Sequence, residues 1–382
     1  MAARSVEFVT TTINEPVFLE GYLENVVAHG HDPTDIGVTV VGDLKTPLSV
    51  REFCEGLTDE FGIDVDYLSV DDQRRLIEQW ELLELDRYLP YNSIQRRNVG
   101  YLAAAAEGAD VIVSLDDDNL AREDDIAGLF STVGDSHEVL EVTTENNWYN
   151  PASMLTYEAE SSRDIYHRGF PYSRRDTSQT YDYERTEREV MVRAGLWFDV
   201  PDIDVITHLE RGPRATSLRE EFEDELVALG DETFAPVNTQ NTAFHTDLMP
   251  LIHTIPMGQS VRGMEVSRFD DIWLGYFLDR VLHETGGTVA YGGPISTHDR
   301  NTHNLKRELE HEAVGVRLNE IVVDTLESIE IEGDDHGDYY RDLIRQFRAE
   351  IDGEVDYEFE AYFNEMLDGM ETWADACDTV LN

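Results

Sequence analysis

Lysine is nearly absent from this chain of 382 residues: Lys45 and Lys306 are the two lysines, and the other basic residues are arginines. Against 29 lysines and arginines stand 80 aspartates and glutamates, which give a net charge of −51. Such a charge repels the nucleic-acid backbone, so no broad nucleic-acid interface is expected. Molar salt shortens the screening length to about 3 Å and suppresses the self-repulsion of such a chain. We interpret the composition as halophilic, an adaptation to a salt-rich cytoplasm.

Cysteine and long apolar runs are also scarce. The two cysteines, Cys54 and Cys377, lie far apart and form no CxxC pattern, so neither a disulfide framework nor a zinc site is expected. The longest apolar stretch, 102–115, is interrupted by Glu107 and Asp110 and falls short of the roughly 18 residues of a membrane span. No apolar signal region opens the chain. We therefore expect a cytoplasmic protein without membrane insertion.

The first third of the chain alternates between strand-like and helical segments. Strand-like runs cover 6–13, 36–41 and 110–115, and helical patterns cover 50–61, 72–88 and 93–107. This alternation predicts an α/β domain with a mostly parallel central sheet flanked by helices. After about residue 140, shorter strand-like runs and more loops indicate a mixed second half on the same sheet. The glycine-rich phosphate loops of simple Rossmann and P-loop proteins are missing.

The end of the chain has a helical pattern. An acidic break at 332–335 precedes amphipathic segments, so we divide the chain into a main domain, 1–328, and a helical C-terminal extension, 329–382. We expect the apolar stripe of this extension to pack on the main domain or on a partner subunit, which leaves a homo-oligomer open. The stripe consists of Phe347, Ile351, Tyr362, Phe363, Met366, Leu367, Met370 and Trp373.

Three consecutive aspartates, Asp116, Asp117 and Asp118, follow the apolar strand-like run 111–115. Neighbouring carboxylates raise one another's pKa, and a divalent cation removes that cost. Oxygen ligands suit Mg²⁺ or Mn²⁺, and such a cation would neutralise a departing diphosphate. The alternative is a solvated acidic turn. Because ligands gather at the carboxyl ends of parallel strands, Asp43 after the run 36–41 belongs to the same candidate site.

Other candidate residues admit both structural and functional interpretations. His298, in GGPISTHDRN, is either a metal ligand or an ordinary surface or core histidine. Asp270 and Asp271 either complement a helix N-terminus or face a sugar. Arg168, in RGFPYSRR, is either a surface arginine or a bidentate clamp for a diphosphate.

An ordered series of motifs resembles the reversibly glycosylated polypeptide family. Its plant members are UDP-arabinopyranose mutases, and the family has also carried the name alpha-1,4-glucan-protein synthase. The resemblance covers nearly the whole chain except about 45–92. The motifs are VTTTINEPVFLEGY, VVGD, RNVGY, SLDDDN, RGFPYSRR, GLWFDVPDID, NTAFHTDLMP, FDDIWLGY, ISTHDRNTHNLKRE and METWADA.

The resemblance implies a GT-A-like nucleotide-diphospho-sugar transferase fold and assigns roles to single residues. Asp116–Asp118 would form the metal and diphosphate site, with His298 near the metal or diphosphate. Asp43 would lie near the nucleoside and Arg97 near the nucleotide or diphosphate. Asp270 and Asp271 would face the sugar. Arg168 matches the arginine on which the family carries its sugar, and Arg175 matches a second arginine required nearby.

Two departures from the family pattern stand out. Asn119 follows the three aspartates where the family usually has cysteine, and SSRDIYH, 161–167, replaces an acidic segment before the matched Arg168. The sugar and its destination therefore do not follow from the resemblance.

Three functional hypotheses remain. The first is a metal-dependent UDP-sugar pyranose/furanose mutase or self-glycosylating protein. The second is a GT-A glycosyltransferase that moves sugar to a surface-glycan or lipid-linked acceptor, with Asp270 or Asp271 as general base. The third is a non-catalytic subunit that binds a nucleotide-sugar. All three have a nucleotide-sugar, most simply a UDP-sugar, as the partner molecule, and the first two use Mn²⁺ or Mg²⁺.

Overall fold

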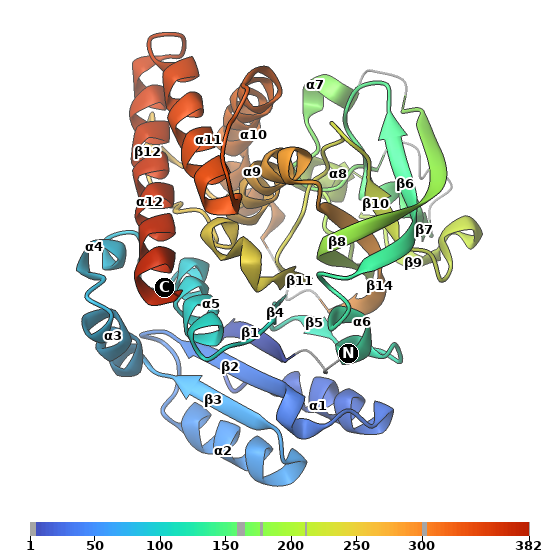
Figure 1. Ribbon diagram of the computed structural model, residues 1–382, viewed down its shortest axis with the longest axis vertical. Coiled ribbons are helices and arrows are strands. Elements are labelled where there is room, and N and C mark those ends of the chain that lie inside the picture. Colours follow the sequence, from blue (N-terminus) through green and yellow to red (C-terminus); the bar gives the residue numbers. More distant parts are fainter. Residues whose placement is uncertain (1–4, 159–164, 176–178, 211, 300–303, 382) are drawn as a thin grey trace.

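The computed structural model describes residues 5–158, 165–175, 179–210, 212–299 and 304–381 (Figure 1). Strands and helices alternate through the first third of the chain, as expected. The strands are β1 Val6–Thr12, β2 Ile36–Gly42, β3 Asp64–Leu68, β4 Val111–Leu115, β5 Asn119–Leu120, β6 Ser136–Thr144, β7 Leu155–Tyr157, β8 Tyr181–Asp199, β9 Ala215–Leu218, β10 Val227–Leu229, β11 Asn241–His245, β12 Ser260–Val261, β13 Met264–Glu265 and β14 Thr288–His298.

Helices cover both faces of the sheet and form the C-terminal end of the described chain. They are α1 Leu19–His29, α2 Ser49–Phe61, α3 Val70–Gln79, α4 Leu83–Asp86, α5 Arg97–Ala106, α6 Ile126–Phe130, α7 Tyr172–Arg175, α8 Val205–Glu210, α9 Asp270–Thr285, α10 Leu305–Ser328, α11 His336–Ile351 and α12 Tyr357–Leu381. One prediction was wrong in detail: the single helix expected over 72–88 is two helices, because the chain turns at Glu81 with a φ of +59°.

The first part of the sheet is parallel, and the rest is mixed. The strand order begins β3-β2-β1-β4, all parallel, and continues with β11, which runs antiparallel to both β4 and β8. Strand β4 is buried throughout, as its apolar sequence indicated. The carboxyl ends of β1, β2 and β4 therefore meet along one edge, where a turn carries the three aspartates.

Apolar clusters fill both faces of the parallel strands. Helices α1 and α2 lie on one face of β1–β3 and α5 lies on the other (Figure 1). Gly100 permits the close approach of α5, since a Cβ there would lie 2.6 Å from Val41 and 2.7 Å from Val9. The same close packing brings Arg97, at the start of α5, under the end of β4.

The C-terminal helices share the core of the sheet domain. All eight residues of the apolar stripe are buried in one cluster with residues of α9 and β14. Trp373 donates its indole N–H to the carbonyl oxygen of Met249, 2.9 Å away. The stripe therefore packs on the main domain. The domain boundary at 328/329 stays a prediction.

No helix in the described ranges combines the length and apolar character needed to cross a membrane.

Candidate functional site

Two adjoining cavities open at the carboxyl ends of β1, β2 and β4. The larger, about 350 Å³, is lined by Asp43, Lys45, Arg96 and Arg97 together with the three aspartates and neighbouring uncharged residues. The smaller, about 180 Å³, adds groups from the second half of the chain. It is lined by Ile94, Asp116, Asp118, Arg168, Pro201, Asp202, Thr239, Gln240, Arg268, Asp270, Asp271 and His298. Since Ile94, Asp116 and Asp118 line both, the cavities adjoin, and we treat them together as one candidate site.

Arg97 and Asp116 form a buried ion pair at the junction of the cavities. Arg97 Nη2 lies 2.5 Å from Asp116 Oδ1, and only 1% of the arginine side chain is exposed. Burial alone would lower the pKa of Arg97, but Asp116 outweighs it and raises this pKa above its ordinary value. The guanidinium also donates to Ser114, Thr11 and the carbonyl oxygen of Thr239. Arg97 thus ties the end of β4 to β1.

Burial and mutual repulsion destabilise the ionised forms of Asp116 and Asp117. Burial, followed by the charges of Asp116 and Asp118, raises the pKa of Asp117 to about 6. Burial also raises the pKa of Asp116, although Arg97 opposes this shift. Carboxylates that destabilise one another in this way gain from a bound cation, which removes both the repulsion and part of the burial penalty.

Asp118 and His298 come together from distant parts of the chain. His298 Nε2 lies 3.3 Å from Asp118 Oδ2, while its Nδ1 lies 2.8 Å from the carbonyl oxygen of Val200. Burial lowers the pKa of His298, but Asp118 outweighs this effect and the net pKa is raised. An Nδ1–H donated to a carbonyl leaves Nε2 free to bind a cation, the arrangement typical of metal-binding histidines.

This pair fits a divalent cation but does not complete its coordination. Across the residues that the structure describes, no group of three or more His, Cys, Asp or Glu side chains is arranged to hold a metal ion. Asp118 and His298 supply one oxygen and one nitrogen, so diphosphate oxygens and water would have to supply the rest, as Mg²⁺ and Mn²⁺ sites allow. A divalent metal is thus compatible with the site, and Asp117 as a third ligand stays a prediction.

Arg168 lies between two carboxylates and uses all of its N–H groups. Its Nε and Nη2 donate to Asp202 at 2.8 and 3.0 Å, and its Nη1 and Nη2 donate to Asp271 at 2.9 and 2.7 Å. Nη1 also donates to the carbonyl oxygen of Arg268 at 2.5 Å. Burial lowers the pKa of Arg168, but the two carboxylates outweigh it and raise this pKa well above its ordinary value. A guanidinium has five N–H donors, so every one here has an acceptor.

Asp270 differs from its neighbour Asp271. Burial and the adjacent charge of Asp271 raise the pKa of Asp270 to about 7. Its Oδ2 accepts a hydrogen bond from the Gln95 amide at 3.1 Å. Asp270 thus lies in the smaller cavity as a carboxyl group that changes protonation near neutral pH, which is the property of a general acid or base.

The remaining predicted residues lie in different places. Asp43 lines the larger cavity and accepts hydrogen bonds from the backbone N–H groups of Leu44 and Ser93. Arg175 is not among the described residues that line either cavity. Its Nη1 donates to Asp204 at 2.9 Å, and its guanidinium carbon lies 3.8 Å from the ring centroid of Tyr172. The structure therefore brings nine of the ten predicted residues to the two cavities and leaves Arg175 outside them.

Sequence reasoning missed the two other charged residues that line the smaller cavity, Asp202 and Arg268. Asp202 is 5% exposed, and its pKa is held below the ordinary value because Arg168 outweighs burial. Arg268 adopts a φ of +65°, which is strained for a residue with a side chain, and donates to buried Glu312 at 2.9 Å. Asp202 lies within the motif GLWFDVPDID, and Arg268 immediately precedes FDDIWLGY, so their places in these motifs were the available signals.

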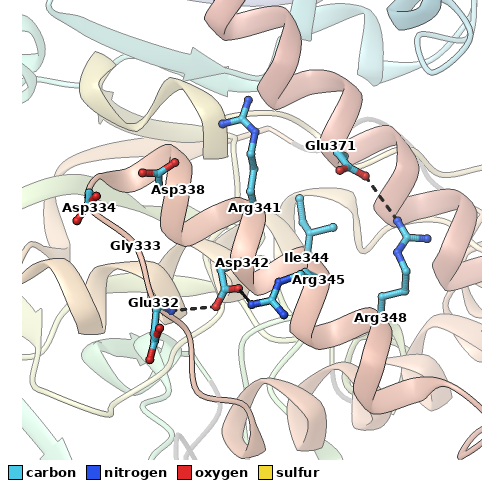
Figure 2. Close-up of a pocket in the computed structure, with 10 residues that line it drawn as sticks. All are labelled: Glu332, Gly333, Asp334, Asp338, Arg341, Asp342, Ile344, Arg345, Arg348 and Glu371. Carbon is cyan, nitrogen blue, oxygen red and sulfur yellow. Dashed lines mark hydrogen bonds and ion pairs between the residues drawn. The ribbon is translucent and has the colours of Figure 1, made fainter.

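A wider hollow of about 750 Å³ lies along α11 and α12 (Figure 2), and its lining does not include Asp116, Asp117 or Asp118. Arg341, Arg345 and Arg348 on α11 line it, and each is paired with carboxylates. Figure 2 shows Arg345 turned to Asp342 and Arg348 to Glu371. None of the predicted site residues lines this hollow, so it is a weaker candidate than the cavities at the strand ends.

Residues 55–381 match the model of the reversibly glycosylated polypeptide family. The chain belongs to this family. Its membership, the parallel order β3-β2-β1-β4 and the acidic turn after β4 agree with the GT-A-like α/β fold that the resemblance implied.

Named relatives of the chain are distant. A probable UDP-arabinopyranose mutase of Arabidopsis thaliana is 24% identical over 271 residues, 69% of this chain and 66% of the relative. A UDP-arabinopyranose mutase of Oryza sativa is 28% identical over 217 residues, 55% of this chain and 53% of the relative. The matches thus span about half to two thirds of these relatives' own length.

A solved mannosyltransferase of Pyrobaculum calidifontis, in complex with GDP-Man and Mn²⁺, aligns with 99% of this chain and 86% of its own at a TM-score of 0.39 and 9% identity.

Proposed function

We propose that this chain is a metal-dependent nucleotide-sugar enzyme, most simply a UDP-sugar pyranose/furanose mutase or self-glycosylating protein. The observation that carries the proposal is that the two cavities adjoin at Asp116 and Asp118. A nucleoside would occupy the cavity beside Asp43, its diphosphate would lie at the aspartates, and its sugar would enter the cavity of Arg168, Asp270 and Asp271. Family membership and the names of its relatives support the same assignment.

We further propose that Asp118 and His298 hold Mn²⁺ or Mg²⁺ together with the diphosphate. Such a cation stabilises negative charge on the departing diphosphate. Arg97 fixes Asp116, and the pair stabilises the end of β4 beside the leaving group. The acidic surroundings otherwise disfavour the binding of a diphosphate, so the nearby arginines and a cation are both needed.

Arg168 is the proposed carrier of the sugar. Transfer of the sugar to its Nη1 requires an acceptor for the proton that this nitrogen loses. As Nη1 bonds to the anomeric carbon, the bond from that carbon to the diphosphate oxygen breaks, and the oxygen keeps the electron pair. The proton of Nη1 passes to Asp271, whose Oδ1 lies 2.9 Å away. Reversal of the step returns the sugar to the diphosphate. Asp202 retains its contacts with Nε and Nη2 throughout.

A second candidate is a glycosyltransferase with a separate acceptor. Two observations favour it: every N–H of Arg168 already has an acceptor, and the pKa of Asp270, about 7, suits a base that removes a proton from an acceptor hydroxyl. In this case Arg168 would orient Asp271 instead of carrying sugar.

The two candidates are separated by the intact mass of the protein after incubation with UDP-sugars and Mn²⁺ in molar KCl, without acceptor. The first predicts an adduct of one sugar that maps to Arg168. Arg168→Ala should abolish the adduct, and Arg174→Ala, which changes a nearby arginine paired with Asp324 and Glu327, should retain it. An adduct at another residue would refute the role of Arg168. If no adduct forms but an added acceptor releases UDP, the second candidate holds.

Binding of UDP-sugars without turnover under all these conditions would instead favour a non-catalytic subunit. A cytoplasmic location, a homo-oligomer and a separate unit at 329–382 stay predictions, which fractionation, light scattering and limited proteolysis would test.

A further inference from the structure

Arg96 lines the larger cavity with part of its guanidinium unused. The side chain is fully buried, with 0% of it exposed. Its Nε donates to Gln73 Oε1 at 2.8 Å, and its Nη1 donates to the carbonyl oxygen of Leu89 at 2.9 Å and to Asp86 at 3.3 Å. Its Nη2 is buried and has no hydrogen-bond partner among the described residues. Two charged N–H donors are therefore unsatisfied in a residue that lines the larger cavity.

The surroundings of Arg96 hold the guanidinium in place. Both N–H groups of the Gln73 amide donate to backbone carbonyl oxygens, of Gly42 at 2.7 Å and of Leu68 at 2.9 Å, so its oxygen is directed to Arg96. The guanidinium carbon of Arg96 lies 4.7 Å from the ring centroid of Tyr91. A buried donor that is fixed but unpaired is costly, and a ligand acceptor removes that cost.

The position of Arg96 points to the nucleoside end of a nucleotide. Its neighbour Arg97 reaches Asp116 at the end of β4, whereas Arg96 is tied through Gln73 to Gly42 at the end of β2. Strand β1 lies between β2 and β4, so their ends are separated by two strand spacings, about 10 Å. A diphosphate bound at the aspartates would therefore leave its base near the β2 end.

We propose that Arg96 Nη2 donates to a carbonyl oxygen of the nucleobase and so selects diphosphates whose base presents such an oxygen. Uracil, cytosine and guanine meet this condition, whereas adenine has amino and ring nitrogens and no carbonyl oxygen. The inference rests on the proposed function, because it takes the cavity to be a nucleoside diphosphate site. Gln73 is then a positioning residue, since it acts through Arg96.

The test measures the affinities of UDP, GDP, CDP and ADP by calorimetry in molar KCl with Mn²⁺. Wild-type protein should bind at least one of UDP, GDP and CDP at least about tenfold more tightly than ADP. Arg96→Lys keeps a positive charge but loses Nη2, and it should weaken the preferred diphosphate about tenfold while changing ADP affinity less than about threefold. Arg74→Met is the matched control, since Arg74 also contacts Tyr91 but is half exposed and outside the cavity lining.

A second measurement needs no variant. Replacing O2 or O4 of the UDP base by sulfur weakens one acceptor at a time, and one of the two thio analogues should bind wild-type protein at least about fivefold less tightly than UDP. If GDP is the preferred ligand, the 6-thio analogue of GDP takes this place. The inference would be overturned if ADP bound as tightly as the other diphosphates. It would also be overturned if Arg96→Lys lost the same affinity for all of them, or if the thio analogues bound as tightly as their parent nucleotides. Failure of the wild-type protein to bind any nucleoside diphosphate would instead refute the proposed function.

Discussion

The arginines of the two cavities differ in how many of their N–H groups have acceptors. Arg168, in the smaller cavity, has acceptors for all five. In the larger cavity, Arg96 Nη2 and Arg97 Nε are buried without a partner among the described residues. The larger cavity is therefore prepared to gain hydrogen bonds from a ligand, whereas a ligand of Arg168 must compete with Asp202, Asp271 or the Arg268 carbonyl. This contrast predicts that Arg96 and Arg97 contribute mainly to ligand binding. Arg168 and its carboxylates should contribute mainly to stability and to the reaction step.

Removing one carboxylate partner of Arg168 should have the largest effect on stability among the variants considered. In Asp202→Asn, Arg168 loses one of its two carboxylates while remaining buried, and loss of one partner of a buried ion pair costs about 3–5 kcal/mol. We expect the free energy of unfolding in molar KCl, measured with a chemical denaturant, to fall by about 3 kcal/mol. Arg74→Met, which removes a half-exposed arginine, should change it by less than about 1 kcal/mol. A similar loss of unfolding free energy in Asp202→Asn and Arg74→Met would show that the ion pairs of Arg168 contribute no special stability.

Breaking the proposed metal pair should reduce cation binding. Asp118→Asn removes the carboxylate that faces His298 at 3.3 Å, and we expect Mn²⁺ affinity in the presence of UDP to fall about 10–100-fold. Calorimetry or electron paramagnetic resonance would measure this loss. Asp299→Asn is the control, because Asp299 is the exposed neighbour of His298. Unchanged affinity in Asp118→Asn would mean that the cation binds elsewhere.

Asp270 should make stability depend on pH. Its pKa is about 7 in the folded protein, against an ordinary value of 3.8, so the folded state favours the protonated form. Between these pH values the folded chain holds a proton that the unfolded chain has lost, and stability therefore falls as pH rises from about 4 to about 7. The resulting loss of unfolding free energy is on the order of 1 kcal/mol or more.

The matched variant isolates this contribution of Asp270. In Asp270→Asn the fall in unfolding free energy between pH 5 and pH 8 should be smaller than in the wild-type protein, while Asp299→Asn should follow the wild-type curve. Parallel curves for Asp270→Asn and wild type would show that Asp270 has an ordinary pKa. If ionised Asp270 is the base of a transferase, the rate should also rise through pH 7.

The smallest effect is expected in the hollow of Figure 2. Arg341 pairs with Asp375 and Asp378 across α11 and α12, but these carboxylates are exposed to solvent. Exposed ion pairs contribute about 0–1 kcal/mol, and molar salt screens them further. Arg341→Ala should therefore change the free energy of unfolding by less than about 1 kcal/mol, measured as for Asp202→Asn. If Arg341→Ala lost as much unfolding free energy as Asp202→Asn, the loss would depend on the ion pair itself and not on its burial.

Much of the site could be predicted because it is local in sequence. Asp116–Asp118 follow a buried strand, Asp43 follows a neighbouring strand, and Gly100 lies one turn after Arg97 in the helix that packs on both. In contrast, the pairing of Asp118 with His298 joins residues 180 positions apart, and the contact of Arg168 with Asp202 and Asp271 joins three segments. Sequence spacing carries no information on such distances, so Asp202 was missed. The role of Arg175, which lies outside both cavity linings, stays a prediction.

By itself, the sequence determined the alternation of strands and helices, the acidic end of β4 and the family, because periodic burial, strand ends and motif order are written along the chain. Only the tertiary structure decided which charges are satisfied. Arg96 and Arg97 are neighbours in sequence, yet one reaches toward the end of β2 and the other toward Asp116. Whether a buried arginine holds a carboxylate or keeps a donor for a ligand depends on acceptors supplied by distant segments, and folding alone brings those together.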